Sequence, residues 1–231
     1  MANTALMGSM AESMAESFVG SFPDRWDLRT RVREGDGDLL VLQPGRPVEL
    51  TGPVGFGLTR IGYRMLAEPS RVAPVAILDV RGWASPLAAW ESGVESPVFV
   101  RCADPSVWPR VLAALLEGVP AVYAEVPKGV RDQDLRRLAA LARARQGRVA
   151  LRPVAGGLPT GVGHLRLRAR EVHWEGPEGG HGRLRGRRIV LEASGKGAAG
   201  TTRTMEVDDA GTHDMRVVSD LAIGQAGRAI G

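Results

Sequence analysis

Short apolar runs alternate with helical patterns over the middle of the chain. The apolar runs are rich in Val, Ile, Leu and Ala, which is typical of strands buried on both faces. The predicted strands cover residues 48–51, 74–80, 98–101, 121–126 and 148–152, and the predicted helices cover residues 58–67, 86–93, 105–118 and 132–146. This alternation predicts an α/β core in which a mostly parallel sheet is flanked by helices.

The pattern changes after residue 152. Apolar and charged residues alternate over residues 164–174, and residues 187–192 repeat a strand pattern beyond a Gly-rich turn. Such alternation is typical of a strand with one face in water, so we expect a late β-hairpin attached to the core.

Changes in composition along the chain predict three regions. Residues 1–46 are rich in small residues and contain Pro and Gly, so we expect a partly disordered N-terminal lead-in. Residues 47–200 form the core. Residues 201–231 are small and polar, so we expect a flexible C-terminal tail, which is either a plain terminus or a segment that docks on a partner.

Composition excludes some classes of site. The net charge of +4 is compatible with anionic partners without requiring them. Cys102 is the only cysteine, so no disulfide can form within the chain, which fits a reducing cytoplasm. The histidines are spaced too loosely for a metal site, and no apolar stretch reaches the roughly 18 residues of a membrane span.

The loop after the first predicted strand carries most of a phosphate-binding motif. Gly52, Gly57 and Thr59 match the pattern G-x-x-x-x-G-K-[ST] of the P-loop. Leu58 stands where that pattern has the lysine that reaches the β- and γ-phosphates. Two interpretations stay open: a weak nucleotide site built from backbone N–H groups, or an inherited tight turn without a ligand.

The order of these segments resembles the RecA-type ATPase core, and in particular the RecA-like ImuA family of bacterial DNA-damage mutagenesis proteins. The resemblance covers roughly residues 45–200. It rests on Glu49-Leu-Thr-Gly-Pro53, Ala76-Ile-Leu-Asp-Val80, Ser92-Gly-Val-Glu95 with Val98–Arg101, Ala121-Val-Tyr-Ala-Glu125, and the late hairpin at residues 164–174 and 187–197.

The resemblance also implies that ATP turnover is lost. Arg81 stands two residues after Asp79, where RecA proteins place a catalytic glutamate, and an arginine cannot activate water as a carboxylate does. Glu125 occupies the Walker B aspartate position and could still reach Mg²⁺; alternatively, Asp79 and Glu125 are strand-end carboxylates near solvent or paired with an arginine. We therefore predict no catalytic residue and no cofactor beyond weak ATP–Mg²⁺ binding. The residues of this degenerate nucleotide site are Gly52, Gly57, Leu58, Thr59, Asp79 and Glu125.

Arginine is abundant in the second half of the core. Residues 131–189 contain fourteen arginines and no lysine, which indicates either a DNA phosphate track or a solvated helix face with the wet side of a hairpin. RecA-like proteins commonly bind DNA through loops that follow core strands. The candidate DNA contacts are Arg166, Arg168, Arg183 and Arg185.

The resemblance implies a non-catalytic accessory subunit of a DNA-damage-inducible translesion-synthesis assembly in the cytoplasm. Its expected partners are a Y-family-polymerase-like subunit and an error-prone DNA polymerase, with DNA as a further candidate and no membrane. Two alternatives stay open. One is a DNA-dependent ATPase in which Lys196 or Arg60 replaces the missing lysine, and the other is a SulA-like inhibitor of cell division.

Overall fold

The computed structural model describes residues 39–176, 186–209 and 215–221, which belong to one compact unit. The predictions for residues 1–38, Arg183, Arg185 and residues 222–231 lie outside the described residues. The helices are α2 (Leu58–Ser70), α3 (Pro86–Glu91), α4 (Trp108–Gly118) and α5 (Asp132–Arg145), with a 3-10 turn η2 (Lys196–Ala198). The strands are β1 (Val48–Thr51), β2 (Val75–Asp79), β3 (Pro97–Arg101), β4 (Ala121–Val126), β5 (Arg148–Pro153), β6 (Leu165–Glu175), β7 (Gly186–Gly195), β8 (Arg203–Asp209) and β9 (Met215–Leu221).

The nine strands of the described residues join one sheet in the order β3-β2-β4-β5-β1-β6-β7-β8-β9. Every pair from β3 to β6 is parallel, and the three pairs from β6 to β9 are antiparallel. The predicted α/β class, with a mostly parallel sheet, flanking helices and a late hairpin, is confirmed. Among the described residues, no helix is long and apolar enough to cross a membrane.

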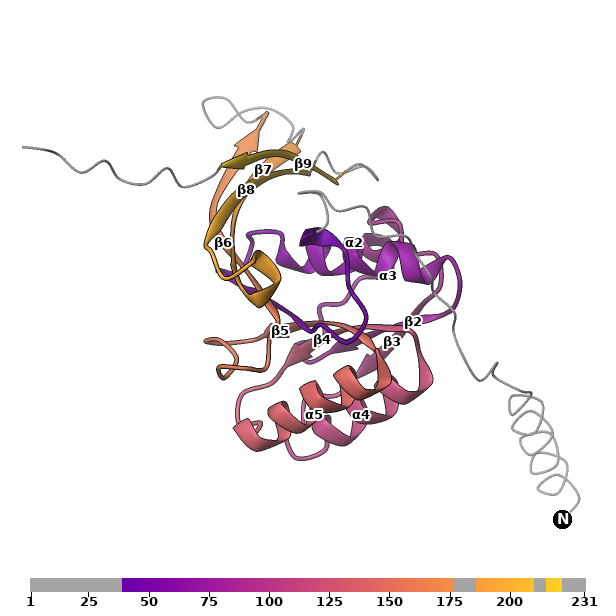
Figure 1. Cartoon of the computed structure of the whole chain (residues 1–231). Coiled ribbons are helices and arrows are strands. Elements are labelled where there is room, and N and C mark those ends of the chain that lie inside the picture. Colours follow the sequence, from indigo (N-terminus) through magenta and orange to yellow (C-terminus); the bar gives the residue numbers. More distant parts are fainter. Residues whose placement is uncertain (1–38, 177–185, 210–214, 222–231) are drawn as a thin grey trace, which may run out of the picture. The chain divides into compact units, whose positions relative to one another are not determined.

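Helices cover both faces of the parallel half of the sheet (Figure 1). On one face α2 and α3 pack over a core that includes Leu50, Ile61 and Ile77. On the other face α4 and α5 pack over a second core that includes Leu78 and Leu112. Val, Ile, Leu and Ala predominate in the central strands because both faces of these strands are covered by helices.

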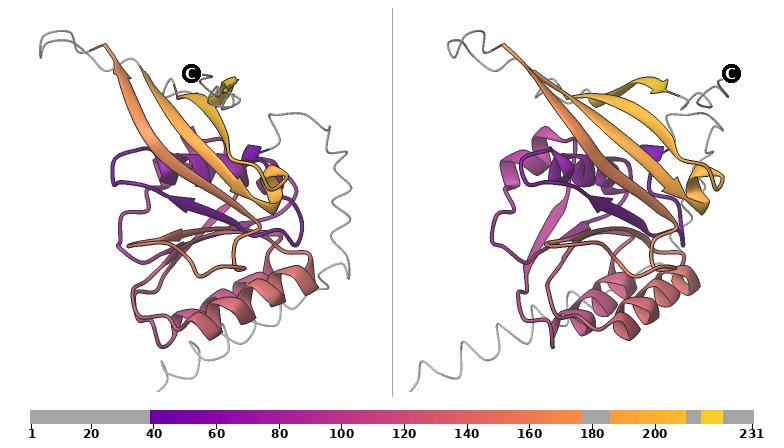
Figure 2. Two further views of the ribbon diagram at one scale, coloured as in Figure 1. Left: turned by 60° about the vertical axis from the view of Figure 1, so that its left-hand side comes forward. Right: turned by 90° about the vertical axis from the view of Figure 1, so that its left-hand side faces the viewer.

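The antiparallel half leaves the parallel half at β6 and rises beside α2 (Figure 2). Leu167, Ile189 and Leu191 from this half are fully buried in the same core as Ile61 of α2. The alternating pattern of β6 buries Leu165, Leu167 and Ala169 and leaves the intervening arginines exposed. The hairpin therefore closes one side of the α2 layer and brings β7 close to the loop after β1.

The prediction of a flexible C-terminal tail over residues 201–231 is wrong for residues 203–209 and 215–221, which form β8 and β9. Residues 203–209 pair with β7, and residues 215–221 pair with β8. Two apolar side chains explain β8, because Met205 and Val207 alternate toward the core and are completely buried. β8 has only these two apolar residues among polar ones, which is why its composition resembles that of a flexible tail.

Candidate functional site

A cavity of about 300 Å³ lies where the parallel strands end, beside the loop between β1 and α2. Parallel strands send their carboxyl ends to one edge of the sheet, so β1, β2, β4 and β5 deliver their last residues to the same place. The structure thus brings Gly57, Leu58, Thr59, Asp79 and Glu125 of the predicted nucleotide site to one cavity. Gly52 lies in the same loop but lines a neighbouring groove instead.

The loop has the tight backbone that its glycines indicate. Gly57 begins α2 with a φ of 79°, and a Cβ atom there would lie 2.7 Å from Ile189 Cδ1 and 2.8 Å from Arg187 Cζ. A side chain is therefore excluded both by the backbone angle and by β7. No side chain caps α2 and no acidic residue lies in its first turn, so its first N–H groups face the cavity edge without a carboxylate.

Leu58 does not reach into the cavity as the missing lysine would. Its side chain is 1% exposed and belongs to the core with Leu50 and Ile61. It packs beneath the loop, where its Cδ1 would lie 3.2 Å from a Cβ atom added at Gly52. Leu58 is therefore a structural residue that anchors the first turn of α2.

Arg81 and the backbone beside it donate to both oxygens of the Glu125 carboxylate. Glu125 Oε1 accepts hydrogen bonds from Arg81 Nε at 3.0 Å and from Arg81 Nη2, and Oε2 accepts from the backbone N–H groups of Val80 at 3.1 Å and Arg81 at 3.2 Å. Burial opposes the charge of Arg81, but the hydrogen bonds and charge of Glu125 outweigh this effect and raise the pKa of Arg81. Of the two interpretations of Glu125, the structure has the carboxylate paired with an arginine.

Asp79 shapes the loop that follows β2. Its Oδ1 accepts from the N–H groups of Gly82 at 2.8 Å and Trp83 at 3.3 Å, and its Oδ2 accepts from Ala84 N–H at 3.2 Å. The turn directs Arg81 back toward Glu125 and places its guanidinium 4.4 Å from the centre of the Trp83 ring. Asp79 thus holds the segment that neutralises Glu125.

Two tyrosines form the floor of the cavity. The rings of Tyr63 and Tyr123 meet edge to face with centroids 5.3 Å apart, and both residues are 1% exposed. Burial is the main cause that raises the pKa of each phenol, and the charges of Asp79 and Glu125 add to it at Tyr63. The Tyr123 hydroxyl lies close to Thr59 and Arg152 but has no partner in hydrogen-bonding geometry.

Three further arginines line the cavity with Arg81, and of these the sequence suggested only Arg60, as a replacement for the missing lysine. Arg152, the fifth residue of β5, is 6% exposed, and its Nη1 donates to Thr59 Oγ1. Arg60 and Arg187 both pair with the buried Asp209 of β8. Arg60 Nη2 lies 3.1 Å from Asp209 Oδ1, and Arg187 Nη2 lies 2.6 Å from Asp209 Oδ2. Lys196, the other suggested replacement for the missing lysine, does not line the cavity.

One signal in the sequence could have identified Arg152. It follows a buried run at the carboxyl end of a predicted parallel strand, where polar side chains gather at the site edge of an α/β sheet. Arg187 and Asp209 carried no such signal, because only the antiparallel pairing of β7 with β8 places them beside each other.

The DNA-contact candidates Arg166 and Arg168 line a groove of about 760 Å³ with Arg170 on the exposed face of β6. Two of these three arginines are already paired. Arg166 Nε lies 2.7 Å from an oxygen of the buried Glu49, and Arg170 Nε donates to Glu192 at 2.9 Å. Glu49 also accepts from the N–H group of Leu158, so Arg166 helps to fix the loop after β5. Arg168 makes no ion pair among the described residues.

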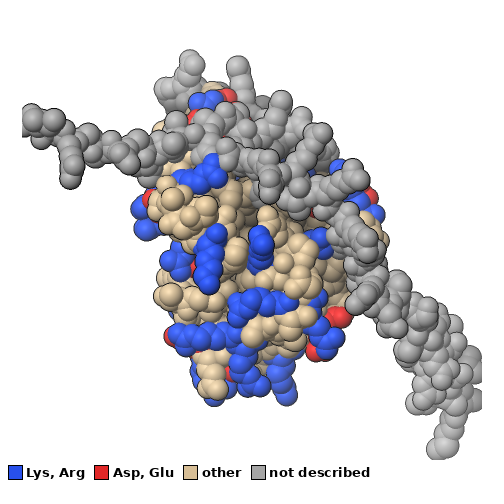
Figure 3. Space-filling view, viewed as in Figure 1, with Lys and Arg blue, Asp and Glu red and all other residues tan. Residues whose placement is uncertain are grey.

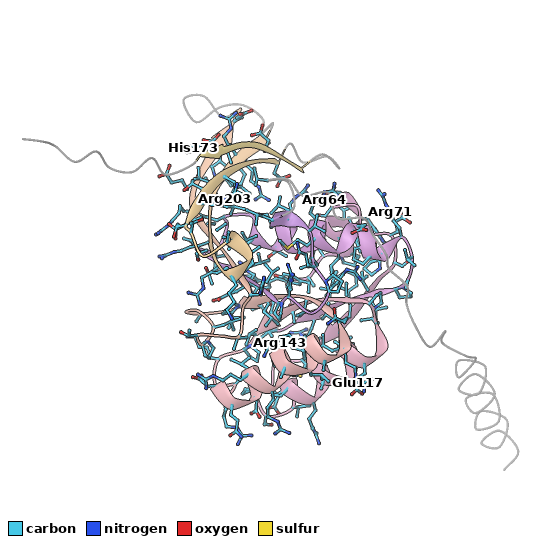
Figure 4. The ribbon with its side chains drawn as sticks, in the orientation of Figure 1. Arg64, Arg71, Glu117, Arg143, His173 and Arg203 are labelled. Carbon is cyan, nitrogen blue, oxygen red and sulfur yellow. The ribbon has the colours of Figure 1, made fainter. Side chains whose placement is uncertain are left out.

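Basic side chains also spread over the helical layer of α4 and α5, with few acidic ones among them (Figure 3). Arg143 on α5 and Glu117 near the end of α4 mark this layer (Figure 4), and Glu117 pairs with Arg145 at 3.7 Å. These arginines are on solvated helix faces, which is one of the two interpretations of the arginine-rich region. Within the described ranges, no group of three or more His, Cys, Asp or Glu could hold a metal ion.

The described site combines two carboxylates with several donors. Both carboxylates already accept hydrogen bonds on each of their oxygens. The open hydrogen-bonding capacity belongs to donors, mainly Arg152 and the first turn of α2.

One family model matches the parallel half of the chain. The model of the MT3502 N-terminal domain matches residues 41–156, which is half of the chain. The matched segment runs from just before β1 to just after β5, so it contains Leu58, Arg81, Glu125 and Arg152, while β6 to β9 lie beyond it. No curated protein matches this sequence. The chain belongs to the MT3502 N-terminal domain family.

Proposed function

We propose that this protein is a non-catalytic RecA-like accessory subunit of a DNA-damage-inducible translesion-synthesis assembly, and that it acts through protein–protein contacts. The observation that carries the non-catalytic part is the bond between Arg81 and Glu125. A RecA-like ATPase needs a carboxylate at each of these positions, and here the first has become a cation that neutralises the second. Leu58 adds to this argument because it is buried beneath the loop.

An exposed apolar cluster supports the protein–protein part of the proposal. Trp83, Leu87 and Trp90 lie within eight residues of the chain, and each is more than half exposed. Leu87 and Trp90 are three residues apart on α3, so they are neighbours on its surface. Exposed tryptophans with aliphatic neighbours are characteristic of docking surfaces, because tryptophan contributes disproportionately to binding energy. We propose this cluster as the contact for a polymerase subunit.

The first experiment is genetic. Deletion of the gene in its host should abolish the rise in mutation frequency after DNA damage, and the native chain should restore it. A Trp90→Ala chain should fail to restore mutagenesis and should no longer co-purify with the Y-family-polymerase-like subunit. Val72→Ala is the matched control, since Val72 is also more than half exposed but lies outside the cluster.

The second experiment separates this proposal from its alternatives. The purified chain should release no phosphate from ATP, with or without single-stranded DNA. DNA-stimulated release would support the ATPase alternative, and filamentous cells on overexpression would support the SulA-like alternative. An unchanged mutation frequency in the deletion strain after damage would refute the proposed role.

A further inference from the structure

A row of ion pairs connects the end of α3 with the paired ends of β7 and β8. Glu91 Oε2, on the last residue of α3, lies 3.4 Å from Nη1 of Arg60 on α2. Nη2 of the same guanidinium lies 3.1 Å from Asp209 Oδ1, at the end of β8. Arg187 of β7 completes the row, with its Nε 2.7 Å and its Nη2 2.6 Å from Asp209 Oδ2. α2 therefore carries a link from α3 to the antiparallel strands that rise beside it (Figure 2).

Exposure to water differs along this row. The side chain of Glu91 is 45% exposed, whereas those of Arg60 and Asp209 are 18% and 2% exposed. Water therefore screens the pair of Arg60 with Glu91, while the pair of Arg60 with Asp209 lies in a medium of lower dielectric constant. The Nε atom of Arg60 is buried without a hydrogen-bond partner among the described residues. How firmly the Arg60 guanidinium is held thus depends on Glu91, the most exposed member of the row.

Glu91 adjoins the apolar cluster of Trp83, Leu87 and Trp90, which is the docking cluster of the proposed function. Leu87 and Glu91 are four residues apart on α3, so their side chains are neighbours on one face of the helix. An interface of standard size covers about 800 Å² of each partner, so a partner seated on the docking cluster also covers Glu91. It removes the water that screens this carboxylate, and the attraction between Glu91 and Arg60 becomes stronger as the local dielectric constant falls.

The other end of the row is where β7 and β8 can open most readily. Arg187 and Asp209 are register partners at the end of the β7–β8 ladder. Opening from a strand end breaks the fewest ladder hydrogen bonds, so it has the lowest free energy of the local motions of these strands. Arg60 is a tie from α2 to this end, and Arg187 extends it to β6, where its guanidinium lies 5.5 Å from the centre of the Trp174 ring.

We propose that Arg60 couples docking on α3 to the ends of β7 and β8, so that a bound partner holds these strands closed. The partner acts on Glu91, and the two Nη atoms of Arg60 transmit the effect to Asp209. The coupling passes through side chains in direct contact, and its two states are the closed and the open strand ends. This inference rests on the proposed function because it takes the docking cluster as the partner's contact, whereas the link from Glu91 to Asp209 belongs to the chain alone.

The test is hydrogen exchange of the full chain, followed by mass spectrometry of peptides from β7 and β8. Glu91→Gln should raise the exchange rate there about two- to five-fold, the range expected for an exposed ion pair. Arg60→Gln should raise it at least about ten-fold, because a buried carboxylate loses a partner. Added to Arg60→Gln, Glu91→Gln should have no further effect, because its route is gone. Glu95→Gln is the matched control, since Glu95 is also exposed and pairs with Arg71 at 3.6 Å, and it should leave the exchange rate unchanged.

A second measurement adds the co-purified Y-family-polymerase-like subunit. Its binding should slow exchange in β7 and β8 of the native chain, and it should leave exchange in the Arg60→Gln chain unchanged although that chain is bound as well. Thermal melts report the folding of each variant. If Arg60→Gln does not fold, Arg60→Lys takes its place, because one ammonium nitrogen then replaces the two Nη atoms that reach the two carboxylates.

Three results would overturn the inference and leave the proposed function standing. They are equal effects of Glu91→Gln and Glu95→Gln, a full effect of Glu91→Gln in the Arg60→Gln chain, or a bound subunit that does not slow exchange in the native chain. A subunit that does not bind would refute the proposed function instead, and the exchange rates of the free variants would still decide whether Arg60 links Glu91 to Asp209.

Discussion

Replacing Arg81 with leucine should destabilise the fold by removing the partner of a buried carboxylate. Glu125 is 3% exposed and would keep only the backbone N–H groups of Val80 and residue 81 as donors. Removing one partner of a buried ion pair typically costs about 3–5 kcal/mol. Because the Arg81 side chain retains 15% of its exposure, we expect the lower end, about 3 kcal/mol.

The assay is equilibrium unfolding in urea followed by circular dichroism, with a double-mutant cycle. Adding Glu125→Gln to the Arg81→Leu chain removes the uncompensated charge, so the loss should shrink to roughly 1–2 kcal/mol. Arg131→Leu is the matched control, since Arg131 pairs with Asp134 at 2.9 Å but is 79% exposed, and it should leave the unfolding midpoint unchanged. The reasoning fails if the two arginine substitutions have the same effect, or if the glutamine restores nothing.

Three further predictions concern the fold. Gly62→Ala should destabilise α2 by about 1–3 kcal/mol although alanine favours helices, because the added Cβ would lie 2.3 Å from the Tyr123 ring. Gly118→Ala is the control: the space around Gly118 is open, so this substitution should be neutral or stabilising, and thermal melts compare the two variants. Met205→Ala should cost about 2–5 kcal/mol in urea unfolding, and a loss below about 0.5 kcal/mol would mean that β8 is dispensable. Burial and two neighbouring cations lower the pKa of His164 in the folded state. As the pH falls through about 6.5, the histidine of the unfolded chain is therefore protonated first. The free energy of unfolding should decrease over this pH range. His164→Asn should flatten that part of a pH series of melts, and an unchanged slope would contradict this cause.

The parallel half was predictable because each strand carries its own signal. The apolar runs at Val75–Asp79 and Ala121–Val126 are long enough to mark buried strands, and the glycine loop between β1 and α2 fixes where the site lies. Local patterns of this kind survive tertiary packing because both faces of these strands are buried. Asp79 and Glu125 were identified through the resemblance to RecA proteins, which uses the order of these same apolar strands.

The antiparallel half and the chemistry of the cavity depend on contacts between distant residues. Arg152 meets Thr59 across 93 positions, and the pair of Arg187 with Asp209 requires that β8 exists. An arginine on an alternating strand has the same local pattern whether it lies in water or against a buried carboxylate. Sequence patterns report the face of a strand, whereas the partner across that face is set by the sheet order.

The bond between Arg81 and Glu125 also limits which residues positions 81 and 58 can accept. A glutamate at position 81 would place a second carboxylate against Glu125, and like charges so close in a buried site repel strongly. A lysine at position 58 would bring an ammonium group into a position that is 1% exposed. Each of these two substitutions, made alone, is therefore expected to destabilise the fold. Under the function proposed above, ATP turnover would require coordinated changes at several positions of the cavity.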